Sequence, residues 1–358
     1  MTTTEGINGS DGAGASVSAK TCIVSAKDLQ RAVADLQHTK PGPGLRKVLL
    51  CTALLAFGTY VAMTAQSTAV FVVAGIFSGL VLSVMIITTH DAIHHTLTGW
   101  GWFDEIVPRL ISWPILWFHG VYSEVHKIHH KMNGDDFNDP ERVQWTAEEY
   151  EKASPLGKFY VRHQWLLDIF VLGGIALIVN TLRSGLRFVK VSKSMRVAVL
   201  SDLIGIVACN VVIYSIAYTQ GATLRWFLFW LILERCTGAV MQWRSHIEHY
   251  GLWGKGRHYF ETQAYSCRNI ATNGFTSWFF NRLNFHSVHH AFPRVPFYLL
   301  ETAHRRFMEL YGADGVERLV EEQGYVATSL RLAANPCVIG APDDQSPSKR
   351  RRMVAVAN

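Results

Sequence analysis

Two long uncharged runs of apolar residues constrain the fold of this chain more than any other feature. They cover residues 48–65 and 68–89, and only Gln66 and Ser67 separate them. The second run, about 22 residues long, spans roughly 30 Å as an α-helix, which matches the hydrocarbon core of a bilayer. The runs therefore predict a tight helical hairpin that crosses a membrane twice. By the positive-inside rule, its start is cytoplasmic because of three preceding basic residues: Lys40, Arg46 and Lys47.

A second hairpin is predicted further along the chain. Residues 197–218 carry a single charge, Asp202, and residues 224–240 follow after a short turn. Glu234 and Arg235 are adjacent near the end of this hairpin, and charged side chains are costly in contact with lipid. We expect these two residues to pair, to face the interior of the helix bundle or to emerge into the cytosol.

Two other apolar stretches are not expected to cross the membrane. Residues 106–118 are too short and contain Pro108 and Pro114, which suits an interfacial or re-entrant segment. Residues 165–182 are nearly long enough, but the basic loop after them and the histidine-rich segment before them both belong on the cytoplasmic side. The predicted fold is an all-α integral membrane protein with a four-helix transmembrane stem of two hairpins and both termini in the cytoplasm.

Composition and charge narrow the class of protein further. Hydrophobic residues make up 49% of the 358 residues and charged residues only 17%, which excludes wholesale disorder. The six cysteines are scattered without a C-x-x-C pair, which argues against a thiolate zinc site or an iron–sulfur cluster. The net charge of +6 suits an anionic lipid surface or an acidic protein partner, and no motif for nucleic-acid recognition accompanies it.

The sequence predicts three parts along the chain. Residues 1–40, which begin with a Gly-, Ser- and Thr-rich stretch, are expected to form a disordered N-terminal tail. Residues 41–310 are predicted to form the membrane domain. Residues 311–358 are predicted to be a C-terminal cytoplasmic segment, which ends in a basic disordered tail from about residue 342.

Half of the 16 histidines fall into three clusters, HDAIH at 90–94, HKIHH at 126–130 and HSVHH at 286–290. On a helix, residues i, i+3 and i+4 share one face, so each cluster can offer its imidazoles to one point. Imidazole is a ligand for divalent iron, copper, nickel and zinc. Eight ring nitrogens exceed what one ion takes, and the clusters therefore predict two metal ions. The predicted ligands are His90, His94, His126, His129, His130, His286, His289 and His290.

A ninth ligand is predicted after the second hairpin. The segment HIEHYG offers His249, with His246 as the alternative. Carboxylates close to the clusters are expected to orient ligands by accepting a hydrogen bond from the second ring nitrogen of a histidine. Asp91 and Asp139 are the predicted residues of this kind.

These motifs resemble the three histidine boxes of the membrane fatty acid desaturase and hydroxylase superfamily, in the family's order, over residues 45–310. The resemblance implies a non-haem di-iron centre that activates dioxygen to cut an unactivated C–H bond. It also implies a mushroom-shaped fold in which a helical cytoplasmic cap holds the metal site above the four-helix stem. In membrane alkane hydroxylases the histidine of a segment similar to EHYGL is an iron ligand, which supports His249.

The resemblance predicts desaturation of a lipid or fatty-acyl-like substrate. The spacing of the second box and the segment HHAFPRVP are similar to those of acyl desaturases, whereas EHYGL is similar to alkane hydroxylases. The alternative is therefore a membrane di-iron hydroxylase that acts on alkyl, acyl or carotenoid-like substrates. A metal transporter is a more remote alternative, because residues 48–65 and 68–89 contain no ionisable ligand apart from Cys51. A zinc hydrolase is another, because it needs only three or four ligands.

Partners follow from what the chain lacks. It carries no haem-binding or iron–sulfur motif, so electrons are expected from a separate ferredoxin, rubredoxin or cytochrome b5 type of protein. The expected basic docking surface includes Lys127, Lys131, Arg244 and Arg268. The membrane lipid or acyl chain is expected to lie in a tunnel lined by aromatic residues: Trp113, Trp117, Phe118, Trp243, Trp278, Phe279 and Phe280.

Overall fold

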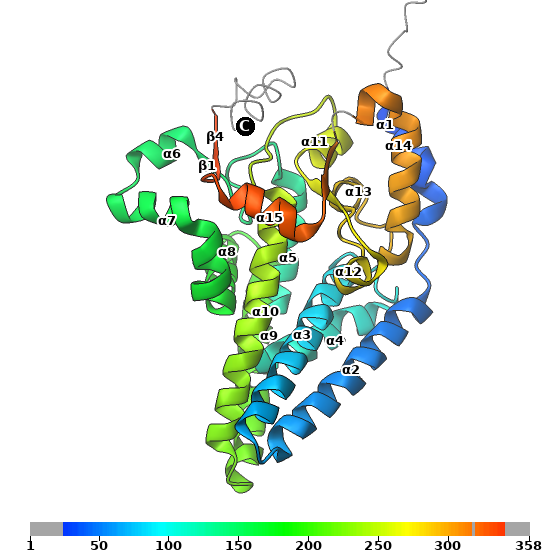
Figure 1. Ribbon diagram of the computed structural model, residues 1–358. Helices are drawn as coiled ribbons and strands as arrows, with labels where there is room; N and C mark the ends of the chain where they lie inside the picture. Colours follow the sequence, from blue (N-terminus) through cyan, green and yellow to red (C-terminus); the bar gives the residue numbers. More distant parts are fainter. Residues whose placement is uncertain (1–23, 317–318, 341–358) are drawn as a thin grey trace, which may run out of the picture.

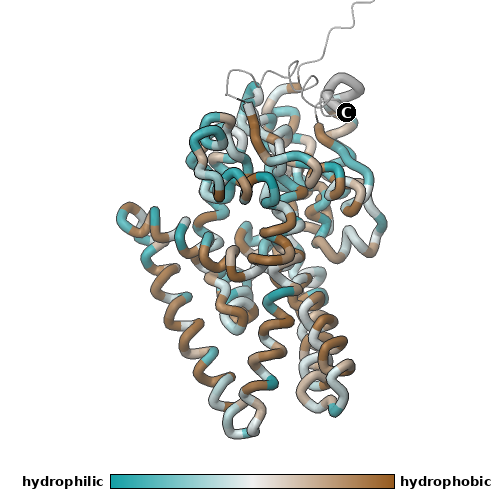
Figure 2. Tube along the Cα trace, turned by 60° about the vertical axis from the view of Figure 1, so that its left-hand side comes forward, coloured by the Kyte–Doolittle hydropathy of each residue, from teal (hydrophilic) through white to brown (hydrophobic). Residues whose placement is uncertain are grey.

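A computed structural model describes residues 24–316 and 319–340, and most of these residues are helical (Figure 1). The glycine-rich start of the chain and the basic cluster at 349–352 lie outside the described residues. Four long helices converge at one end of the molecule, and shorter helices with two small sheets form the other end. Figure 2 shows that hydrophobic residues dominate the long helices and that hydrophilic residues are concentrated at the opposite end.

The first two long helices are α2 (Pro41–Thr64) and α3 (Thr68–Ile93), joined by a short turn. Both helices approach their neighbours closely at glycines. A Cβ built on Gly58 of α2 would overlap the side chain of Ser78. One built on Gly79 of α3 would lie 2.5 Å from Cβ of Cys236 in the long helix α10 (Thr223–His249). Helix α3 is therefore the central helix, with α2 on one side and α10 on another (Figure 1).

The second pair is α9 (Lys193–Thr219) and α10 (Thr223–His249), joined by a turn at Gly221 with φ of +65°. Asp202, the one charge in the apolar part of α9, is fully buried rather than exposed to lipid. It accepts hydrogen bonds from Nε1 of Trp113 at 3.1 Å and from the backbone N–H of Val121 at 3.0 Å. Nε of Arg109 lies 3.6 Å from Oδ1 of Asp202, so the segment from Arg109 to Val121 compensates this buried charge.

The same part of the chain contains residues 106–118, for which an interfacial or re-entrant segment was predicted. Helix α4 (Gly101–Ser112) exposes Trp102, Ile106 and Leu110, and it is followed by η2 (Trp113–Ile115) and α5 (His119–Met132). An amphipathic helix with an exposed apolar face suits the boundary between lipid and water.

The apolar stretch around residues 165–182 is a broken helix. Helix α7 (Pro155–Leu166) continues into a π-helical turn, η3 (Leu167–Leu172), and then into α8 (Gly173–Phe188) at a sharp bend, where Gly173 has φ of +52°. The adjacent charges of α10 hold this break. Glu234 accepts a hydrogen bond from the N–H of Ile175 at 2.7 Å, and Arg235 donates to the carbonyl of Val171 at 2.7 Å.

Glu234 and Arg235 form an ion pair with each other, which is one of the arrangements that the sequence predicts. Their further role was not predicted. Each satisfies backbone groups that the break in the helix leaves without partners. At the same place Gly238 of α10 packs directly on the backbone of Gly174.

Within residues 24–316 and 319–340, four helices are long and apolar enough to cross a membrane: Pro41–Thr64, Thr68–Ile93, Pro155–Phe188 and Lys193–Thr219. This set differs from the prediction in one member. It contains the continuous stretch of α7, η3 and α8, which the sequence analysis assigned to the interface. It omits α10, because Glu234 and Arg235 lie in the middle of that helix and lower its mean hydropathy.

The prediction that residues 1–40 are disordered is wrong for the described part of that segment. Helix α1 (Ala26–Val33) begins at a capping box of Ser25 and Asp28, buries Leu29 and Val33, and packs against α14 (Leu300–Val316). Arg306 of α14 donates to the carbonyl of Ala32 at 2.7 Å. Local capping and a long-range contact therefore order the segment. The 3₁₀ turn η1 (Ala34–Leu36) connects it to α2.

The remaining elements complete the end of the molecule opposite to the converging helices. Two pairs of parallel strands join distant parts of the chain, β1 with β4 and β2 with β3. The strands are β1 (Trp145–Thr146), β2 (Arg268–Ala271), β3 (Val320–Gln323) and β4 (Val338–Ile339). The helices are α6 (Ala147–Lys152), α11 (Tyr259–Tyr265), α12 (Gly274–Phe279), α13 (His286–Ala291), η4 (Phe297–Leu299) and α15 (Tyr325–Ala333).

Candidate metal centre

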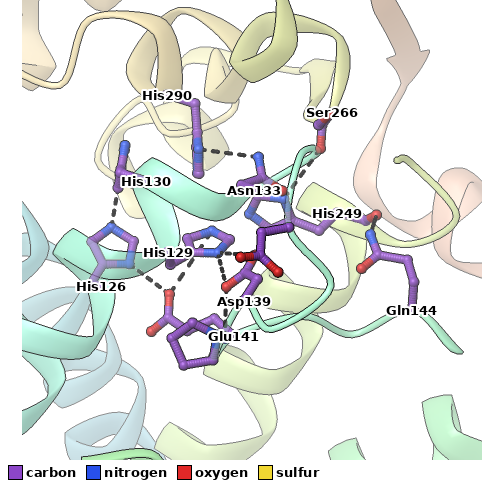
Figure 3. Close-up of polar contacts among 12 residues, drawn as sticks. His126, His129, His130, Asn133, Asp139, Glu141, Gln144, His249, Ser266 and His290 are labelled. Carbon is purple, nitrogen blue, oxygen red and sulfur yellow. Dashed lines mark hydrogen bonds and ion pairs between the residues drawn. The ribbon is translucent and has the colours of Figure 1, made fainter. Parts of the chain in front are cut away.

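The three histidine clusters meet in space although they are far apart in the sequence. The first lies at the end of α3, the second on α5 and the third on α13, while His249 is the last residue of α10. Eight of the nine predicted ligands are buried, and His94 is partly buried. Figure 3 shows the side where α5, α10 and α13 come together.

The histidines form two groups. Within each group one ligand atom per residue lies within 4.8 Å of the others. Nε2 of His130 is 3.0 Å from Nε2 of His126 in the first group, and Nε2 of His286 is 3.0 Å from Nε2 of His249 in the second. The first group is His90, His94, His126, His130 and His289; the second group is His249, Cys267, His286 and His290.

His129 lies beside the second group. Its ring centroid is 4.9 Å from that of His249 and 5.0 Å from that of His290. All nine predicted histidines are thus brought together. Cys267 was not predicted, and its sequence position gives no sign of it, because it stands alone and far from any histidine cluster.

The chemistry of these groups fits transition-metal ions. Buried ring nitrogens normally have hydrogen-bond partners, because each unpaired one lowers the free energy of unfolding by about 1–3 kcal/mol. Burial lowers the pKa of His126, His130 and His289 well below the usual value, so these rings are in the neutral form that binds a metal. Among the nine predicted ligands, buried ring nitrogens without a hydrogen-bond partner belong to His90, His94, His130, His286, His289 and His290.

Acceptors from the loop after α5 contact two of the predicted ligands (Figure 3). Nδ1 of His129 lies 2.9 and 2.8 Å from the two carboxylate oxygens of Asp139, as predicted for this residue. Nδ1 of His126 lies 2.7 Å from Oε2 of Glu141. Burial acts to lower the pKa of His129. The charge of Asp139 and its hydrogen bond to His129 outweigh this effect, so the pKa of His129 is raised. Burial also raises the pKa of Glu141 to about 7.

Gln263 is an orienting residue that the sequence did not indicate. Its side-chain oxygen lies 3.1 Å from Nδ1 of His290, and its amide nitrogen donates to the carbonyl of Asn133 at 3.0 Å. Gln263 lies on α11, which carries no metal-ligand motif, so only the packing of α11 on α13 could identify it.

The structure places Asp91 away from the ligands, contrary to the prediction. Its carboxylate accepts a hydrogen bond from the side chain of Asn281, whose own oxygen accepts from Nζ of Lys47 at 2.8 Å. The physical reason is helical geometry, since successive residues differ by about 100° around the axis and Asp91 follows His90 directly. Asp91 therefore joins α3 to α2 and to the loop before the third box.

The alternative ligand His246 is also directed elsewhere. Its Nε2 lies 3.0 Å from a carboxylate oxygen of Asp168, and its Nδ1 lies 2.9 Å from the carbonyl of Gln242. The expected basic surface needs a correction as well. Arg244 and Arg268 are buried, and their partners are Glu248 and the end of α10.

Comparison with known proteins agrees with this arrangement. The family model for fatty acid desaturases matches residues 66–320, which is most of the chain, and the protein belongs to that family. A curated relative, the sn-1 acyl-lipid omega-3 desaturase (ferredoxin) of Nostoc sp. (strain 36), is 24% identical over 119 residues. This match covers 32% of the chain and 32% of the relative. Membership of the family and the four described apolar helices indicate an integral membrane protein, and its clustered histidines could hold metal ions.

Proposed function

We propose that the protein is a dioxygen-dependent desaturase that holds two iron ions and introduces a double bond into a lipid or fatty-acyl-like substrate. One observation carries the proposal. Histidines from three boxes and from the end of α10 form two adjacent, buried groups with unpaired ring nitrogens. The proposed ligands are His90, His94, His126, His129, His130, His249, His286, His289 and His290. Iron bound there would supply the activation of dioxygen that removal of hydrogen from an unactivated C–H bond requires.

The chain itself provides an apolar pocket for the substrate. The pocket lies between α3, α8 and α10, and its lining includes Ile86, Leu177 and Met241. Ile86 is one helical turn before His90, so the pocket adjoins the first ligand group. Trp117, an expected tunnel residue, lines the pocket, whereas Trp243 packs against Phe280 and Tyr325. We propose that an alkyl chain lies here, shielded from water, with the carbons to be oxidised toward the histidines.

The reaction outcome is testable with labelled dioxygen. We expect a desaturated product without ¹⁸O after incubation under ¹⁸O₂, because desaturation removes two hydrogens and returns both oxygen atoms as water. Mass spectrometry of lipids from a host that expresses the protein measures this outcome. A product with one labelled oxygen and no new double bond would contradict desaturation and favour the hydroxylase alternative, to which EHYGL at residues 248–252 is similar.

We further propose that α2, α3, α9 and α10 are the transmembrane stem and that the metal centre lies in a cytoplasmic cap. The break at Gly173 supports this assignment, because α8 has only 16 residues. The part before the break, residues 155–172, carries Lys158, Arg162 and Asp168, which are costly in lipid. In Figure 1, α7 and α8 stay near the cap, whereas α9 and α10 extend to the far end.

Reporter tags test this topology. Tags at either terminus and in the loop at Ser192 are expected to report the cytoplasm, and a tag at Gln220 the opposite side. The excess of Lys and Arg near Ser192 and the even number of spans are the reasons. Accessibility to a membrane-impermeant reagent in intact cells and in inverted vesicles measures the side. A Ser192 tag on the non-cytoplasmic side would show that Pro155–Phe188 crosses the membrane.

A separate protein is proposed to deliver the electrons. The name of the Nostoc relative specifies ferredoxin for that enzyme. Ferredoxin is therefore the preferred donor type, with rubredoxin and cytochrome b5 as alternatives. Lys127 and Lys131 on α5 directly follow proposed ligands in the sequence, and both are exposed. Of the four basic residues expected to dock an acidic electron donor, we therefore keep these two in the proposal.

A further inference from the structure

The family match ends at residue 320, where the last described segment begins. Residues 320–339, here termed the C-terminal strap, contain β3, α15 and β4. Figure 1 shows α15 crossing the upper end of α10. The strap contacts the elements that carry the second ligand group at several separate points.

The first contact is the pairing of β3 with β2. The register runs from Arg268 opposite Val320 to Ala271 opposite Gln323. Cys267 of the second ligand group directly precedes β2. On its other side β2 bridges to Phe285, the residue before His286. The short sheet therefore connects the strap to two members of the second group.

The second contact is electrostatic. Arg268 is buried and donates hydrogen bonds to the carbonyls of Ile247 at 2.5 Å and Tyr250 at 3.0 Å, which holds the end of α10 on either side of His249. An uncompensated buried guanidinium is strongly destabilising. Glu322 of the strap lies 3.7 Å from Nε of Arg268 and supplies the opposite charge.

The third contact is aromatic. The ring of Tyr325 stacks on Phe280 with centroids 4.4 Å apart and meets the edge of Trp243 at 5.7 Å. Nε1 of Trp243 donates to Oγ of Ser329 at 2.6 Å. Helix α15 is thereby fixed against α10 about two turns before His249.

Trp243, which Tyr325 contacts, directly precedes a charged pair of α10 beside the second group. In this pair Nε of Arg244 lies 2.7 Å from Oε1 of Glu248. The other oxygen, Oε2, lies 3.4 Å from Nε2 of His286. The strap thus packs on the residues that set the position of Glu248 against the second group.

We infer that the C-terminal strap is a structural part of the metal centre, and that Glu322 and Tyr325 are positioning residues for the second ligand group. The inference rests on the proposed two-iron function. Four of the five ligands of the first group come from α3 and α5, whereas the strap contacts described above fall on α10, β2 and the loop before α13. Loosening the strap therefore selectively weakens the second site.

Iron content and iron release measure this selectivity. In the full-length protein, Glu322→Gln and Tyr325→Ala are expected to retain one iron per chain firmly. The other iron should pass to a chelator about 10–100-fold faster than in the wild type, as for loss of an orienting partner. Mössbauer spectra should show loss of one of two iron signals. Glu321→Gln, on the neighbouring residue of β3, and Val326→Ala, at an exposed position of α15, are the matched controls and should behave as wild type.

Each outcome decides the inference. Wild-type release of both ions from both variants overturns it, and so does equal loss of both ions with general unfolding. Hydrogen exchange separates it from failure of the proposed function. If the wild type binds no iron, the proposed two-iron function is wrong. The role of the strap is then still tested by the hydrogen-exchange rates of the backbone amides of residues 244–252. Their exchange should be about tenfold faster in Glu322→Gln and Tyr325→Ala, and unchanged in the controls.

Discussion

Alanine at His130 or His286 is expected to abolish desaturation and to reduce the iron content below two ions per chain. These residues belong to the first and the second ligand group respectively, and both are buried. Loss of an outer orienting partner already costs about 10–100-fold in affinity or activity, so loss of a ligand should cost more than about 100-fold. Product formation by mass spectrometry and iron by elemental analysis of the purified protein are the measurements.

Two other histidines are suitable controls for this experiment. His163→Ala should keep both iron and activity because His163 lies on α7, outside both ligand groups. His246→Ala should keep its iron for the same reason, although it removes the contact with Asp168. His249→Ala is the decisive variant for the ninth ligand. Full activity in that variant would remove His249 from the ligand set and return His246 to consideration.

Gly238→Ala is expected to give the largest loss of stability among substitutions outside the metal centre. A Cβ at this position would overlap the backbone nitrogen of Gly174, and backbone cannot move aside as a flexible side chain does. Overpacking usually costs about 1–3 kcal/mol, and a backbone clash belongs at the upper end, about 3 kcal/mol. The result should be a lower midpoint of thermal unfolding in detergent, together with loss of the contact between α8 and α10.

Gly42→Ala is the matched control for this prediction. Gly42 is also helical, but nothing lies within 4 Å of a Cβ built there. We expect its unfolding midpoint to be unchanged or slightly raised, since alanine restricts the unfolded chain more than glycine does. Equal midpoints for Gly238→Ala and Gly42→Ala would show that α8 can separate from α10 without cost, and the broken helix would then not be fixed by this contact.

The features that follow local periodicity were predictable from the sequence. Long apolar runs identify α2, α3 and α9, because a helix in lipid must be apolar over a fixed length. The i, i+4 spacing of each histidine cluster, with a third histidine at i+3 in two of them, gives a shared face. The structure brings all nine predicted histidines together. Asp139 was predictable because it lies ten residues after His129 in an acidic loop, close enough along the chain to fold back.

The sequence by itself determined which residues can bind metal and which helices are apolar, since both properties depend on residue type and short spacing. Tertiary structure alone decided which hydrogen-bond partners lie beside these residues and helices. Asp91 is directed toward Asn281, about 190 residues away along the chain, and Gln263 reaches His290 only because α11 packs on α13. Glu234 and Arg235 hold a broken helix whose backbone groups no local pattern reveals. Partners of this kind depend on long-range packing, which a periodic pattern within one element does not encode.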